Sequence, residues 1–195
     1  MSFPFSLLRI GKDAFCHCER LTKIYIPKGV TNIGNDVFSY CSNLTSIVVA
    51  TENPKFDSRN DCNALIETET NKLIVGCNTS TIPVGIVVIA DSAFASCKDL
   101  TSIVIPDGVI NIGYRAFYGC TGLTEVSIPN GVMAIKSSTF ADCSRLANIT
   151  IPESVTTIGS SAFKGCVALA NVTIPDSVTT IEEDAFKGTD IKPAK

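Results

Sequence analysis

The sequence repeats itself every 23 residues, and this period constrains the fold more than any other feature. One complete copy, residues 100–122, reads L-x-x-I-x-I-P-x-x-V-x-x-I-G-x-x-A-F-x-x-C-x-x. Leu, Ile or Val, Pro and Cys recur in the same register over about seven copies, which excludes a chance origin. The Phe column shows the spacing most clearly, with a single wider step of 56 residues; it contains Phe15, Phe38, Phe94, Phe117, Phe140, Phe163 and Phe186.

Each position of the repeat has a physical meaning. The alternation x-Ile-x-Ile-Pro predicts a half-buried strand in which Ile24 and Ile26 point inward while Lys23 and Tyr25 point outward. Pro27 donates no backbone hydrogen bond and ends the strand. Polar residues before Ala-Phe predict the N-caps of short helical turns; they include Asp36, Ser92, Ser138, Ser161 and Asp184.

One copy cannot bury its own apolar face, whereas stacked copies bury a continuous one. We therefore predict one solenoid over residues 1–195, mainly β with short helical turns, whose core consists of ladders of identical residues. Residues 1–20 form an incomplete first coil, and residues 189–195 form a C-terminal tail in which the apolar repeat residues stop.

The repeat motif resembles the leucine-rich repeats of the bacterial surface antigen A family, also called the Treponema pallidum type. The resemblance covers nearly the whole chain, residues 4–188. It implies a right-handed leucine-rich-repeat coil of about seven 23-residue units and no enzymatic activity of its own.

Residues 50–82 depart from the repeat and predict a β-hairpin insert. Short apolar strands at 64–67 and 72–75 flank a polar turn. Pairing Glu67 with Lys72 places Cys62 opposite Cys77. These two cysteines are either small buried hydrophobic residues or a cross-strand disulfide, which requires a Cα separation of about 5.5 Å and an oxidising compartment.

Six of the other seven cysteines follow the repeat, one beside Phe and Leu in each coil, and Cys16 stands outside this column. Adjacent coils bring these cysteines close enough to pair, but burial favours free thiols that behave as small hydrophobic side chains. Cys16-His17-Cys18 resembles a metal-binding fragment. Zinc needs four convergent ligands, and at most two here share a direction, so neither a metal site nor a cofactor is expected.

Composition argues against several classes of function. A net charge of -3 and an isoelectric point near 5.2 argue against a nucleic-acid binder. The longest apolar stretch, residues 84–90, is far shorter than the roughly 20 residues of a membrane helix, and the N-terminus has no signal-peptide pattern. The single His leaves no catalytic triad, and Glu182-Glu183-Asp184 more simply favours a helix N-terminus, so we expect no enzyme.

Solenoids bind partners through extended surfaces, and the outward strand positions are the candidates. We predict a monomer that binds a protein or glycoprotein through this strand face, where Tyr25, Val48 and Val104 form an apolar stripe. The family resemblance implies a cell-surface or secreted protein that adheres to host matrix proteins or other cells. A passive spacer and an intracellular scaffold are the alternatives. The predicted ligand-binding residues are Lys23, Tyr25, Ser46, Val48, Ser102, Val104, Glu125, Ser127, Asn148, Thr150, Asn171 and Thr173.

Overall fold

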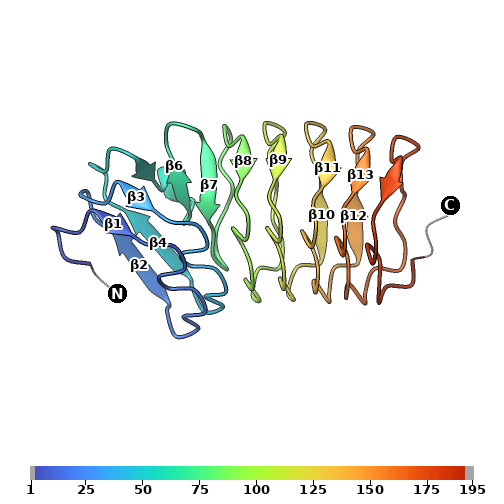
Figure 1. Ribbon diagram of the computed structural model, residues 1–195, viewed down its shortest axis with the longest axis horizontal. Helices are drawn as coiled ribbons and strands as arrows, with labels where there is room; N and C mark the ends of the chain where they lie inside the picture. The colour runs from blue at the N-terminus through green and yellow to red at the C-terminus, as the bar shows by residue number, and fades with distance from the viewer. Residues whose placement is uncertain (1–2, 192–195) are drawn as a thin grey trace.

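The computed structural model describes residues 3–191, which form a stack of coils with the two termini at opposite ends (Figure 1). Each regular coil contributes a segment of one column, which is a strand in four of the coils, then a turn and a two-residue strand of a second column. The first column contains β2 (Lys23–Ile26), β4 (Ser46–Val49), β10 (Glu125–Ser127) and β12 (Asn148–Thr150). The second contains β1 (Arg9–Ile10), β3 (Asn32–Ile33), β7 (Lys72–Val75), β8 (Val88–Ile89), β9 (Asn111–Ile112), β11 (Ala134–Ile135), β13 (Thr157–Ile158) and β14 (Thr180–Ile181).

Equivalent residues of neighbouring repeats lie side by side. Lys23 is paired with Ser46 in the parallel β2–β4 sheet, and Glu125 is paired with Asn148 in the parallel β10–β12 sheet. Strand β2 alternates exposed and buried residues, so Ile24 and Ile26 point into the core as predicted. The 23-residue solenoid predicted from the sequence is therefore confirmed.

The Phe column forms the centre of the core. In the C-terminal coils (residues 83–191) the side chains of Phe94, Phe117, Phe140 and Phe163 are fully buried. Neighbouring rings from Phe94 to Phe186 lie 5.0–5.6 Å apart and within 15° of parallel. The column is therefore a continuous stack of aromatic rings.

The predicted N-caps are wrong, because the chain makes turns rather than helices at these positions. Ser138 and Asp142, for example, have positive φ values of 56° and 59°, and the corresponding residues of other coils do the same. This left-handed backbone points N–H groups at the next coil: those of Ser138, Phe140 and Asp142 donate to carbonyls 22 residues later at 2.7–2.9 Å. Among residues 3–191, the helical segment η1 (Arg59–Asp61) in the insert stands alone.

The cysteines of the repeat are free thiols with a bonding role that the sequence does not reveal. The thiols of Cys120, Cys143 and Cys166 each donate to the carbonyl of the Phe 26 residues earlier, at 3.0–3.1 Å. Cys41 makes the same bond to Phe15 in the N-terminal coils (residues 3–49), and burial raises its pKa to about 11. All four thiols therefore act as hydrogen-bond donors to the backbone of a neighbouring coil.

The insert (residues 50–82) crosses the solenoid as a wall between two cores. Strands β5 (Phe56–Asp57), β6 (Leu65–Glu67) and β7 pair antiparallel, and β7 then joins β8 in parallel. The hairpin strands and the pairing of Glu67 with Lys72 are as predicted. Leu65 and Val75 pack into the core of the N-terminal coils, whereas Ile66 and Leu73 pack into that of the C-terminal coils.

Cys62 and Cys77 are both buried free thiols, so the disulfide alternative is not formed in the structure. A bulge between Leu65 and Ile66 shifts the hairpin register, and it lies between the hairpin turn and the two cysteines. Cys62 packs into the C-terminal core, and Cys77 packs into the N-terminal core. The two thiols therefore lie on opposite faces of the insert.

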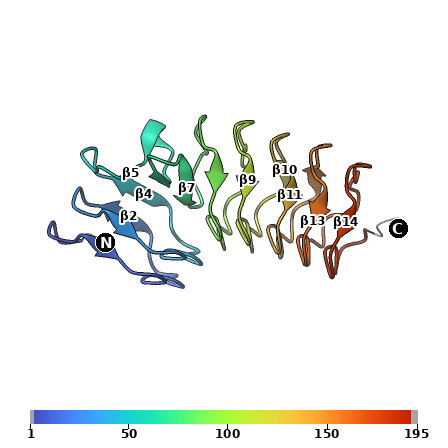
Figure 2. The same cartoon turned by 45° about the horizontal axis from the view of Figure 1, so that its top comes forward.

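The stack bends at the insert, a region that we call the elbow. Gly76 occupies the place of the Phe, because its N–H donates to Ala93 just as that of Phe94 donates to Ala116. A side chain at Gly76 would overlap the Phe94 ring. Strands β2 and β4 are inclined relative to the C-terminal coils, and Figure 2 shows the resulting curvature. Of the predicted tail 189–195, residues 192–195 lie outside the described part.

Candidate functional site

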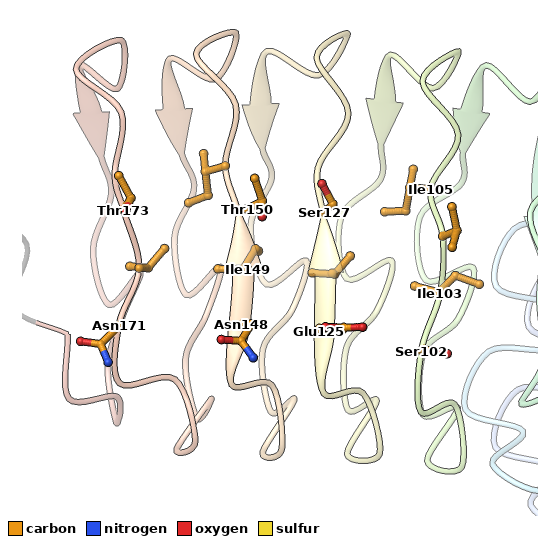
Figure 3. A pocket seen from close by; sticks show the side chains of 14 residues that line it. Ser102, Ile103, Ile105, Glu125, Ser127, Asn148, Ile149, Thr150, Asn171 and Thr173 are labelled. Carbon is orange, nitrogen blue, oxygen red and sulfur yellow. The ribbon is translucent and has the colours of Figure 1, made fainter.

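The strand face of the C-terminal coils forms a groove with a volume of about 840 Å³. Its walls consist of outward side chains of four successive coils (Figure 3). All eight predicted residues of these coils line it: Ser102, Val104, Glu125, Ser127, Asn148, Thr150, Asn171 and Thr173.

Strand geometry explains why these side chains converge. Within β10 the pattern is exposed, buried, exposed, so Glu125 and Ser127 point outward while Val126 points into the core. The parallel register then sets Ser127 beside Thr150, one coil further along. The isolated bridge between Ser102 and Glu125 extends the alignment to the preceding coil.

The floor of the groove is apolar, and its rim is polar. Ile103, Ile105, Ile149 and Ile151 are buried beneath the outward side chains and belong to the continuous core. Glu125 is the one ionisable residue among the lining side chains. The groove therefore offers hydroxyl and amide groups in repeating rows, and a single charge.

The predicted residues of the N-terminal coils lie on a separate patch. Tyr25 and Val48 are neighbours in the β2–β4 sheet and are 40% and 46% exposed. The insert meets the free edge of β4, where the Asn63 side chain accepts from the N–H of Ile47 at 2.7 Å and donates to the Thr45 carbonyl at 2.7 Å. The predicted stripe is therefore interrupted, and Val104 belongs to the groove instead.

The structure leaves the Cys16-His17-Cys18 fragment without metal-site geometry. The His17 ring stacks on Tyr40 at 4.5 Å, and Cys16 and Cys18 are partly buried thiols. Within residues 3–191, no group of three or more His, Cys, Asp or Glu side chains is arranged to hold a metal ion. In the same range, no helix is long and apolar enough to cross a membrane.

The burial of strand residues could be predicted from the period of two, but the split of the strand face could not. The positions that divide it, Asn63 and Ser58, lie outside the repeat, and Ser58 accepts from the N–H of Val49 at 3.2 Å. Polar residues placed just before an apolar strand were the available signal. Nothing in their spacing indicated that they would contact β4.

Comparisons with known proteins agree with this architecture. The family model described as BspA type leucine rich repeat region matches residues 1–73 and 66–192, in six copies. A search of curated protein sequences gives no match.

Solved structures of similar proteins come from several bacteria. A leucine rich cell surface protein from Faecalibacterium prausnitzii is 35% identical, with a TM-score of 0.84 over 95% of this chain; the chain spans half of that protein's length. A leucine-rich repeat protein from Eubacterium ventriosum is 24% identical, with a TM-score of 0.60 over all of this chain and 66% of the other.

The leucine rich repeat protein of T. pallidum is also 24% identical, with a TM-score of 0.52 over 90% of this chain and 78% of the other. At this identity the last two likenesses establish the fold. With the family model matched along almost all of the sequence, the chain belongs to the BspA type leucine-rich repeat family.

Proposed function

We propose that this protein is a non-enzymatic binding module that holds a protein or glycoprotein on the strand-face groove of its C-terminal coils. The observation that carries this proposal is the groove itself. It has a volume of about 840 Å³ and extends over four successive coils. Because its walls repeat from coil to coil, it suits an extended partner surface.

The chemistry of the lining supports binding rather than catalysis. Acid–base catalysis needs positioned groups that exchange protons near the working pH, whereas the groove lining has Glu125 as its sole ionisable side chain. Ser, Thr and Asn side chains instead form hydrogen bonds to a partner, and Val104, 82% exposed, adds apolar contact area.

We further infer that the protein acts at the cell surface or outside the cell. The support is the similarity to a Faecalibacterium prausnitzii protein described as a leucine rich cell surface protein. A partner at that location would be a host matrix protein or another cell-surface glycoprotein.

Binding of the purified, reduced protein to immobilised extracellular-matrix and plasma glycoproteins tests the proposal. The groove variant Val104→Ser with Asn148→Ala removes one apolar contact and one amide from the lining. We expect at least a tenfold loss of affinity, about 1.4 kcal/mol. The matched control, Met133→Ser with Asn130→Ala, makes the same changes at exposed positions outside the groove and keeps the affinity.

Two results would overturn the proposal. If no glycoprotein on the panel binds saturably, the protein is a passive spacer. If binding is lost instead with Tyr25→Ser and Val48→Ser, the site lies on the N-terminal patch and not in the groove.

A further inference from the structure

A second cavity lies at the elbow, on a different side of the coil from the strand face. Its volume is about 500 Å³. The N-terminal coils contribute Asp13, Asp36 and Tyr40 to its lining, and the C-terminal coils contribute residues that include Tyr114 and Arg115. These residues belong to the turns that follow the second strand column.

The cavity exists because the insert recedes here. In the insert, buried Val75, Gly76 and Cys77 take the place of the projecting turn of a regular coil. Tyr40 and Tyr118, from coils on opposite sides of the insert, meet edge to face at 6.0 Å. The cavity is therefore a consequence of the insert and not of the repeat.

A smaller cavity of about 190 Å³ continues it. The two share Asp36 and Asp91, and the smaller one adds Glu67 and Lys72 from the hairpin. Together they form a trough, which we call the elbow trough, at the junction of three structural units.

The trough holds hydrogen-bond acceptors, donors and aromatic rings together. Asp13, Asp36 and Asp91 supply carboxylates, Arg115 supplies a guanidinium, and serine hydroxyls supply both kinds of group; the serines are Ser92, Ser137 and Ser138. The rings of Tyr40 and Tyr114 line it from the N-terminal and the C-terminal coils.

Cations already lie beside these acceptors and rings. The Lys12 ammonium is 3.8 Å from the Asp13 carboxylate, and that of Lys136 lies 5.0 Å from the centre of the Tyr114 ring. Arg115 lies within the lining itself. Glu67 and Lys72 add one charge of each sign, so four carboxylates face four cations. This balance favours a neutral ligand that both donates and accepts hydrogen bonds.

We propose that the elbow trough binds a neutral saccharide of about two pyranose rings. Sugar hydroxyls donate to carboxylates and accept from a guanidinium, and such charge-assisted bonds are about twice as strong as neutral ones. Tyr114 is 52% exposed, so the apolar C–H face of a pyranose packs against the face of its ring that Lys136 does not cover. This site is separate from the strand-face groove and does not depend on the function proposed for it.

The test uses the whole chain and four neutral disaccharides: maltose, lactose, cellobiose and N,N′-diacetylchitobiose. Saturation-transfer NMR and titration calorimetry measure binding, and a glycan array extends the panel. We expect at least one disaccharide to bind, Tyr114→Ala to weaken it at least tenfold, and Tyr114→Phe to restore it. The matched control Phe5→Ala removes another exposed aromatic ring, 81% accessible, and leaves binding unchanged.

Other outcomes overturn the proposal. If no saccharide on the array or in solution binds, or if Tyr114→Ala binds as tightly as the wild type, the trough is no saccharide site. If an oligo-arginine peptide binds there and no sugar does, its ligand is cationic. Binding of a free disaccharide identifies a soluble sugar as a ligand. If the ligand is instead a glycan carried by a protein, the trough binds a glycoprotein, and enzymatic deglycosylation of that glycoprotein abolishes the binding.

Discussion

The C-terminal coils and the N-terminal coils use the same repeat but are joined differently to their neighbours. In the C-terminal coils one Phe stack and one core run from the insert to the last coil. In the N-terminal coils the Phe stack contains only Phe15 and Phe38, Phe3 meets Phe15 at a tilt of 60°, and the column stops at the insert. The hydrophobic core of a solenoid can therefore be divided in two while the coils continue to stack on one another.

The insert replaces the repeat's ladders with individual side-chain hydrogen bonds. Asn53 donates to the carbonyls of Pro27 and Val30 at 2.8 and 2.9 Å. Arg59 forms a bidentate pair with Asp57, with N–O distances of 2.6 and 2.8 Å. A coil that departs from the repeat can therefore stack between regular coils if it forms hydrogen bonds with their backbone groups and presents an apolar surface to the core on each side.

The largest expected effect is a difference in unfolding free energy between variants of the two Phe columns. Phe117→Ala leaves a cavity inside a fully buried ring stack and should cost about 3–5 kcal/mol of unfolding free energy. Phe15→Ala removes a partly buried ring near the end of the short stack and should cost roughly 1–2 kcal/mol. Urea unfolding measures both, and equal losses would refute the contrast between the two stacks.

High pH should weaken the thiol column. Burial raises the pKa of Cys41 from 9.0 to about 11, so the folded state holds this proton more tightly than the unfolded state does. Its contribution is fully present below pH 9 and is lost as the pH rises towards 11. The loss is about 2 kcal/mol by pH 11.

Urea unfolding of the wild type and Cys41→Ala at pH 8 and pH 11 isolates this contribution. The stability advantage of the wild type should shrink as the pH rises. An advantage that stays constant or grows would show that the thiol is not protected in the folded state. Cys97, Cys120 and Cys166, whose pKa values burial also raises, predict the same trend for the C-terminal coils.

Gly76 tests the junction between the two regions. A methyl group there would overlap the Phe94 ring, so Gly76→Ala should cost about 1–3 kcal/mol as that ring shifts. Gly108→Ala is the matched control, because its nearest neighbour, the Ile86 carbonyl oxygen, lies 3.5 Å away. If both variants unfold at the same urea concentration, the Phe94 ring does not pack tightly against Gly76 of the insert.

These regions also differ in how far the sequence predicts them. The strand alternation and the Phe, Cys and Leu columns follow from periodicity, because identical residues in register must stack. The sequence does not distinguish the left-handed turns at positions such as Ser138 from helix caps, since Ser and Asp favour both. The elbow trough lay beyond prediction, because it depends on how far the insert recedes between Tyr40 and Tyr114.

The smallest expected effect concerns the aromatic contact that bridges the elbow. Tyr40 stacks on His17 and meets Tyr118 edge to face, and such pairs contribute about 0.5–1.5 kcal/mol beyond their buried area. A double-mutant cycle of Tyr40→Leu and Tyr118→Leu, measured by urea unfolding, should give a coupling energy in this range. Additive losses would mean that the insert alone joins the two regions, whereas coupling means that the coils on either side also support each other directly.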